Sequence, residues 1–173
     1  MGENPSNLPL RKVIINREEE ETSFNVTRGP GEGQAVWVPG HKVICKANGE
    51  ETGGAYSLLE VIMTGQGLPQ HIHKAEDEAF YVVEGEVTVR RGEETITAAA
   101  GTYVLIPRGT SHTFWTTGST PAKVLGIFSP PGFEQFFVET GDPDKEPDVD
   151  SYIEKAMAVS DKFNVEISGP PLG

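Results

Sequence analysis

Short apolar runs alternate with turn-forming clusters along the middle of the chain. Between about residues 34 and 138, runs rich in Val, Ile, Tyr and Phe are separated by Gly, Pro or acidic clusters roughly every ten residues. This pattern is typical of antiparallel sandwiches and small barrels. It predicts an all-β domain of two facing sheets, with strands at residues 35–38, 42–46, 56–63, 70–73, 78–83, 87–90, 94–98, 103–106, 112–116 and 123–128.

The two ends of the chain have a different pattern. Residues 1–33 are polar and include an acidic run and a Gly/Pro cluster, which predicts a loosely attached N-terminal arm. Near the other end, Ser151 and Glu154 have the spacing of a capping box, and a short one-sided apolar face follows. We therefore expect a barrel at residues 34–140, followed by a C-terminal linker and a helix packing on the barrel at residues 141–173.

Length and charge restrict the partners of this domain. The 173 residues suit one domain, and a composition of 36% apolar residues is enough for a core. The formal net charge, 14 − 26 = −12, disfavours nucleic acid and anionic membranes and leaves small-molecule ligands open. Cys45 is the only cysteine, so it cannot build a disulfide framework, and the sequence has no apolar run of the length that a signal peptide or a spanning helix needs. We expect a cytoplasmic protein with a small-molecule substrate.

The chemistry of the chain centres on its histidines. His71 and His73 are separated by one residue, so a strand would direct both imidazoles to the same side. After a polar turn, Glu78 would open the next strand facing inward, and His112 follows a second tight turn. Three imidazoles and one carboxylate suit one divalent transition metal ion and leave positions for water, substrate or O₂. Mn, Fe, Co, Ni, Cu and Zn all accept this donor set.

Each of these residues also has an ordinary structural interpretation. Glu76 or Asp77 would replace Glu78 if the parity of the strand were different, and both are otherwise expected to be turn carboxylates. His41 lies between Gly40 and Lys42 at a predicted turn, so we expect it on the surface.

The two histidine segments resemble the motifs of the cupin superfamily. The first motif, G-x5-H-x-H-x4-E-x6-G, and the second, G-x5-P-x-G-x2-H, are met by Gly65, His71, His73, Glu78, Gly85, Gly101, Pro107, Gly109 and His112. The resemblance implies a double-stranded β-helix, or jelly-roll, barrel whose metal is bound by His71, His73, Glu78 and His112. It also implies a homodimer. Thr116 stands where the second motif often has Asn, which makes germin-type oxalate oxidases poor analogues.

The flanking segments 51–55 and 131–137 are similar to bacterial single-domain cupins of the quercetin 2,3-dioxygenase-like kind. That similarity implies a dioxygenase in which the metal takes a deprotonated flavonol hydroxyl, O₂ adds across the heterocycle, and carbon monoxide is lost. Glu78 would be both ligand and catalytic base, with a pKa near neutrality. Inward positions predict the substrate pocket at Met63, Phe80, Val82, Val104, Ile106, Phe114 and Phe128.

The alternative is a metal-binding cupin without redox chemistry, either an isomerase or epimerase or a small-molecule binding module. A phosphorylated sugar would need inward Lys or Arg, which the strands of the predicted site do not offer. Tyr56 and Trp37 are candidates to cap the mouth of the barrel. We expect the aromatic cluster at 133–137 to anchor the C-terminal segment or to contact a second subunit.

Overall fold

The computed structural model describes residues 25–65, 67–116 and 120–172. The strands in these ranges are β1 (Gln34–Val38), β2 (His41–Ala47), β3 (Ser57–Met63), β4 (Pro69–His73), β5 (Asp77–Glu84), β6 (Glu86–Arg91), β7 (Glu94–Ala99), β8 (Tyr103–Ile106), β9 (His112–Trp115), β10 (Ala122–Ser129) and β11 (Val165–Pro171). The helices are α1 (Glu134–Thr140) and α2 (Val149–Val159). The ten strands predicted from the sequence are confirmed, each to within one residue at either end.

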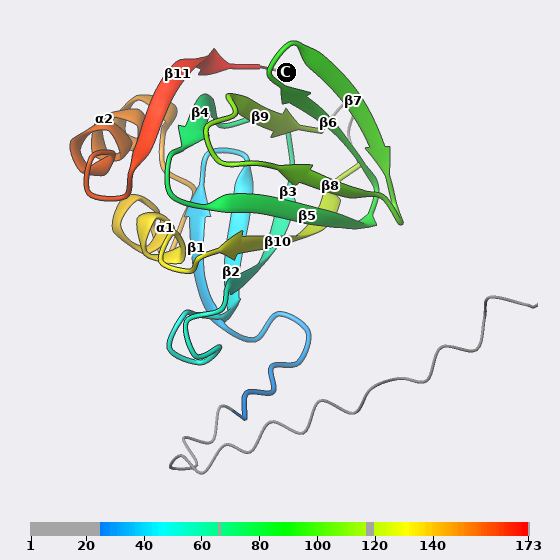
Figure 1. Cartoon of the computed structure of the whole chain (residues 1–173), viewed down its shortest axis with the longest axis vertical. Coiled ribbons are helices and arrows are strands. Elements are labelled where there is room, and N and C mark those ends of the chain that lie inside the picture. The colour runs from blue at the N-terminus through cyan, green and yellow to red at the C-terminus, as the bar shows by residue number, and fades with distance from the viewer. Residues whose placement is uncertain (1–24, 66, 117–119, 173) are drawn as a thin grey trace, which may run out of the picture.

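The strands form two antiparallel sheets that face each other (Figure 1). One sheet has the order β1-β2-β3-β10-β5-β8, and the other has the order β11-β4-β9-β6-β7. The predicted all-β class with two sheets is therefore confirmed. The core lies between the sheets, since strands such as β3 alternate buried residues (Leu59, Val61 and Met63) with partly exposed ones.

The C-terminal part of the chain contains more structure than the sequence predicted. Helix α1 and strand β11 were not expected, and both helices lie together beside the sheets (Figure 1). Strand β11 pairs with β4, where Val165 is opposite His73 and Ile167 is opposite His71. The chain end therefore covers the edge of the strand that carries the two histidines.

The N-terminal cap of α2 differs from the predicted one. Asp148, rather than Ser151, is the cap residue, and its Oδ1 accepts a hydrogen bond from the Ser151 backbone N–H at 2.9 Å. The predicted capping-box role of Ser151 was therefore wrong by three residues, because Asp148 has the extended backbone that a cap requires.

None of the helices in the described ranges is long and apolar enough to cross a membrane.

Candidate metal centre

Four side chains from three strands meet between the sheets. His71 and His73 on β4, Glu78 on β5 and His112 on β9 each offer a donor atom, and these atoms all lie within 4.8 Å of one another. The four residues are between 1% and 8% exposed. This group has the composition and compactness of a site that could hold one metal ion.

The strand pattern explains how these residues meet. His71 and His73 share a face of β4, and His71 is the cross-strand partner of His112 on β9. Glu78 belongs to the opposite sheet, where it pairs with Ile106 and Phe128 and faces the imidazoles across the interior. The cluster therefore bridges the two sheets.

Backbone carbonyls fix the orientation of two imidazoles. Nδ1 of His71 donates to the Pro69 carbonyl at 2.8 Å, and Nδ1 of His112 donates to the Thr110 carbonyl at 2.9 Å. Because a carbonyl only accepts, each Nδ1 carries a proton and each Nε2 is directed to the centre. This is the arrangement by which proteins orient histidine ligands.

The third imidazole has no such partner. Both ring nitrogens of His73 are buried and make no hydrogen bond, although Nε2 lies 3.2 Å from Glu78 Oε2. Buried polar atoms are nearly always satisfied, so an unpartnered pair in a cluster of donors calls for an explanation. A divalent transition metal ion fits, because it would accept the lone pair of His73 Nε2.

The charges of the cluster are strongly coupled. Burial would raise the pKa of Glu78, but the hydrogen bond from His112 and the nearby His73 lower it well below the usual range. Burial opposes protonation of His112, yet its 2.8 Å hydrogen bond to Glu78 raises the His112 pKa. Burial and the two neighbouring imidazoles hold the pKa of His71 well below its usual value. Glu78 is therefore an ionised carboxylate here, in contrast to the near-neutral pKa expected from the sequence.

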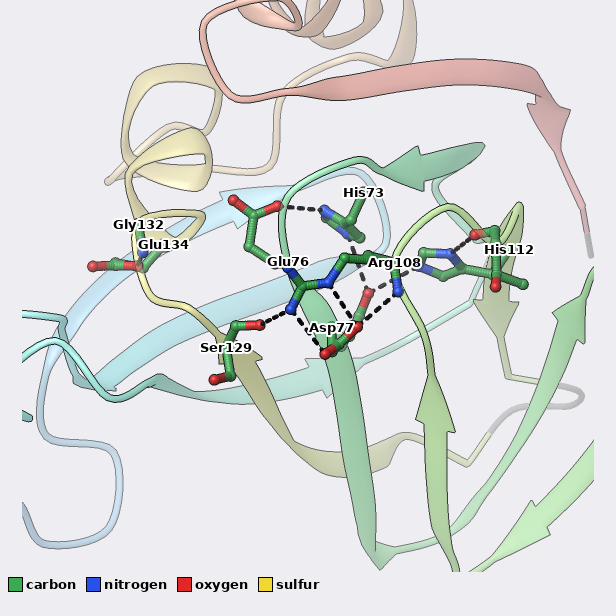
Figure 2. Close-up of polar contacts among 10 residues, drawn as sticks. His73, Glu76, Asp77, Arg108, His112, Ser129, Gly132 and Glu134 are labelled. Atoms are coloured by element: carbon green, nitrogen blue, oxygen red, sulfur yellow. Dashed lines mark hydrogen bonds and ion pairs between the residues drawn. The ribbon is translucent and has the colours of Figure 1, made fainter.

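The two neighbouring acidic residues lie outside the cluster (Figure 2). Asp77 is partly exposed and accepts hydrogen bonds from the Arg108 backbone and guanidinium at 2.9 to 3.1 Å, which lower its pKa to about 2. Glu76 is buried, and its Oε2 lies 3.8 Å from His73 Nδ1 without a hydrogen-bond partner. Glu76 therefore lies beside the imidazole of His73, whereas Asp77 lies at the surface.

Aromatic rings cover His73 on its remaining sides. The Phe133 ring meets His73 edge to face at 4.1 Å between centroids, and Phe128 lies at 5.5 Å. Phe133 also stacks on Phe136 at 4.9 Å, so it joins the centre to helix α1. Sequence reasoning assigned Phe133 to anchoring the C-terminal segment, and it contacts the site as well.

A small apolar cavity lies in the interior, and Glu78 is one of the residues that line it. Its volume is about 20 Å³, and Phe80, Phe114 and Phe128 from the predicted substrate pocket line it. The other four predicted pocket residues are buried in the core but do not line this cavity; they are Met63, Val82, Val104 and Ile106. Tyr56 lies on a separate surface groove with Arg28, and Trp37 pairs through its backbone with Asp142.

His41 lies in the interior, so the predicted surface position was wrong. It is 1% exposed and lines the apolar cavity. The turn predicted from Gly40 exists, but β2 starts directly at His41 and places it on the inward face with Val43. The two-residue spacing between His41 and Val43 was the sequence signal that could have revealed this. Burial lowers the pKa of His41 to about 4, although its hydrogen bond to the Pro39 carbonyl opposes the shift.

We expect His41 to make the stability of the protein depend on pH. Between pH 6.5 and about 4 the unfolded chain binds a proton that the folded chain does not, so stability rises with pH in this window. The free energy of unfolding should fall by about 3 kcal/mol from pH 7 to pH 4 through this residue. Urea denaturation at both pH values should show a smaller fall in His41→Phe than in the wild type; equal falls would contradict the assignment.

The comparisons with known proteins agree with this geometry. Residues 58–128 match the family model of the cupin domain. The chain contains a cupin domain. This range includes all four residues of the cluster and the strands that carry them.

The cupin domain is similar to two curated bacterial proteins over part of its length. It is 32% identical to quercetin 2,3-dioxygenase of Bacillus subtilis (strain 168) over 79 residues, which cover 46% of this chain and 23% of that protein. It is 30% identical to polyketide synthase CurC of Streptomyces cyaneus over 96 residues, covering 54% of this chain and 62% of that one. The chain thus spans about a quarter to three-fifths of the length of these relatives.

The fold is also similar to that of a solved protein structure. The structure of Pac13, described as a nucleoside dehydratase, gives a TM-score of 0.54 at 15% identity and covers 64% of this chain and 87% of its own. At this level of identity the likeness shows the fold alone.

Proposed function

We propose that this cupin is a metal-dependent, quercetinase-like dioxygenase that cleaves a flavonol or a similar enolisable aromatic with O₂. The observation that carries the proposal is a buried set of three imidazoles and one carboxylate, of which the carboxylate, Glu78, also lines an apolar, aromatic-lined cavity. The partial similarity to quercetin 2,3-dioxygenase supports the same chemistry.

In this proposal His71, His73, Glu78 and His112 hold one divalent transition metal ion. A bound ion of this kind orients the ionised hydroxyl of the substrate and stabilises its negative charge. His71 and His112 direct Nε2 towards the metal position, because backbone carbonyls accept hydrogen bonds from their Nδ1 protons. Glu78 accepts a hydrogen bond from His112 Nε2 in this structure, and a bound ion would displace that Nε2 proton.

The remaining steps are carried by the cavity and by Glu78. Glu78 lines the cavity and receives the proton of the substrate hydroxyl. Phe80, Phe114 and Phe128 pack against the aromatic rings and exclude water. The substrate and O₂ are then converted to a ring-opened ester and carbon monoxide, so both oxygen atoms stay in the ester product.

The competing function is a metal-binding cupin without redox chemistry. Among the described residues, the buried polar set contains His, Glu, Ser and Thr but neither Lys nor Arg. A phosphorylated or other anionic sugar would find no buried cation beside the cluster. This observation favours a neutral aromatic substrate over the sugar phosphates of an isomerase.

The decisive experiment is anaerobic purification, loading with each of Mn, Fe, Co, Ni, Cu and Zn, and measurement of O₂ uptake and carbon monoxide release with quercetin. We expect stoichiometric uptake and release with at least one redox-active metal. If no metal gives O₂ uptake or carbon monoxide release, with quercetin or with a panel of other enolisable aromatics, the dioxygenase is rejected and the isomerase or binding function is favoured.

Glu76 should strengthen metal binding through His73. With a metal on Nε2, His73 Nδ1 must carry the proton, and the Glu76 Oε2 carboxylate oxygen lies 3.8 Å from it. We expect Glu76→Gln to weaken metal affinity about 10- to 100-fold, because the carboxylate orients the ring and raises its basicity. Competition with a zinc chelator measures this. Asp77→Asn is the matched control, and an equal affinity in both variants would contradict the role of Glu76.

We further propose a homodimer that uses the outer face of the β5-β8 edge. Tyr81, Val83, Tyr103 and Leu105 lie on these two adjacent strands and are 38% to 59% exposed. Exposed apolar side chains on an edge strand and its neighbour are typical of an interface. Sedimentation velocity should show a dimer that Leu105→Glu converts to a monomer, whereas Met157→Glu on α2 leaves it intact. A monomeric wild type would reject the dimer.

A further inference from the structure

The apolar cavity has two ionisable side chains in its lining, Glu78 and His41. Glu78 belongs to the metal centre, whereas His41 has no role in the proposed metal site. The Nδ1 of His41 donates to the Pro39 carbonyl at 2.9 Å, so its Nε2 carries a lone pair. That Nε2 is buried and has no hydrogen-bond partner.

The register of the sheet separates the two groups. Glu78 on β5 is opposite Phe128 on β10. His41 on β2 is opposite Met63 on β3, and Met63 is in turn opposite Ala122 on β10. The two groups therefore enter the cavity six residues apart along β10. Between these positions lies Gly126, which faces the cavity and has no side chain to fill it.

A buried water molecule is a poor partner for His41. The cavity volume of about 20 Å³ admits one water molecule, but a buried water needs two to four polar neighbours. The lining residues other than Glu78 and His41 present apolar side chains or, at Gly126, none, so a water molecule beside His41 would have few polar neighbours. A buried acceptor of this kind needs a partner, and a ligand group that enters the cavity would supply one.

We propose that His41 is a substrate-binding residue whose Nε2 accepts a hydrogen bond from a hydroxyl at the end of the substrate remote from the metal. The inference rests on the proposed function and narrows its substrate class. The substrate is a rigid aromatic that binds the metal centre through one hydroxyl and carries a second hydroxyl at its distal end. A monohydroxylated analogue leaves His41 unpaired and binds more weakly.

The cavity must become larger before it can hold such a molecule. A ring system needs more than the present volume, and Phe114 is the aromatic wall residue that is partly exposed. Its ring lies 6.1 Å from His41 and 5.5 Å from Phe80 between centroids. A rotation of the Phe114 ring would enlarge the cavity beside His41.

The test is a binding cycle on the zinc-loaded protein without O₂, so that no turnover occurs. Quercetin carries distal hydroxyls, and 3-hydroxyflavone has the same metal-binding hydroxyl without them. We expect His41→Phe to raise the Kd of quercetin about tenfold and that of 3-hydroxyflavone less than about twofold. His41→Gln places an amide oxygen near the Nε2 position and should restore most of the quercetin affinity. His41→Asn keeps a donor for the Pro39 carbonyl but lacks the distal acceptor, so it should resemble His41→Phe.

A second readout separates this inference from the dioxygenase proposal. In ¹⁵N-histidine NMR spectra, quercetin should shift the His41 Nε2 resonance towards that of a hydrogen-bonded acceptor. Phenol should cause the same shift at His41, and this shift should not depend on binding to the metal. Equal losses for both flavonols in His41→Phe, or no Nε2 shift with quercetin and phenol, would overturn the role of His41. Failure of both flavonols to bind, with a phenol-induced shift at His41, would reject the flavonol substrate and retain the hydroxyl-binding residue.

Discussion

Replacing His71 or His112 with alanine will abolish stoichiometric metal binding and leave a folded protein. Each substitution removes one of four donors from a cluster whose atoms lie within 4.8 Å of one another, and losing a direct ligand weakens metal affinity more than the 10- to 100-fold typical of losing an outer partner. After loading with zinc and dialysis, elemental analysis should give about one ion per wild-type chain and less than about 0.1 per variant chain. Circular dichroism and thermal unfolding should show the same fold.

Two features of the structure sharpen this experiment. His112 donates a hydrogen bond to buried Glu78, so His112→Ala leaves that carboxylate with fewer partners and costs more stability than His71→Ala. His71→Ala is therefore the variant that isolates metal binding from folding. His41→Asn is the control, because His41 is a buried histidine outside the cluster, and it should keep the full ion. Full metal retention in both alanine variants would refute the ligand assignment.

Glu78→Gln will reduce O₂ uptake with quercetin by at least about a hundredfold, which is the usual contribution of a positioned proton acceptor. Glutamine has the shape of glutamate but can neither accept the hydroxyl proton nor supply negative charge to the metal. Uptake must be measured at saturating metal, with the bound ion quantified in the same sample, so that lost chemistry is separated from lost metal.

Glu76→Gln is the matched control for this second variant. Glu76 is also buried beside His73, but its carboxylate lies outside the cluster and does not line the cavity. Its turnover at saturating metal should remain within about threefold of the wild type, even though its metal affinity falls. Undiminished O₂ uptake in Glu78→Gln would remove Glu78 from the proposed chemistry.

The sequence was most informative where its pattern had a short period. The strands could be predicted because apolar runs and turn residues alternate, and His71 and His73 could be placed on one face because strand side chains alternate. The position of Glu78 followed from one assumption, that residues 74–77 form a turn. The structure places Glu78, and neither Glu76 nor Asp77, in the cluster.

Other features depend on contacts that a local pattern does not contain. Strand β11 includes Gly169 and two prolines, which read as a chain end, and it forms only because β4 offers an edge for pairing. Helix α1 has seven residues and is stabilised by the packing of Phe136 and Phe137 in the core. The low pKa of Glu78 comes from two imidazoles that approach it through space.

His41 shows the same limit at a single residue. Its neighbours Gly40 and Lys42 are typical of a surface turn, and the turn is present. What places the imidazole inside is the start of β2 at His41 itself, with Met63 directly opposite. Strand boundaries are the least certain part of a sequence-based prediction, and here a shift of one residue changes a surface histidine into a cavity residue.

The central claim is that one metal ion is bound where the two sheets meet at His71, His73, Glu78 and His112. Anomalous diffraction from crystals of the zinc-loaded protein, collected on both sides of the zinc absorption edge, tests it most directly. We expect one strong peak per chain, at about 2.0–2.2 Å from three imidazole Nε2 atoms and a Glu78 carboxylate oxygen. A peak elsewhere, or none in zinc-saturated crystals, would contradict the claim.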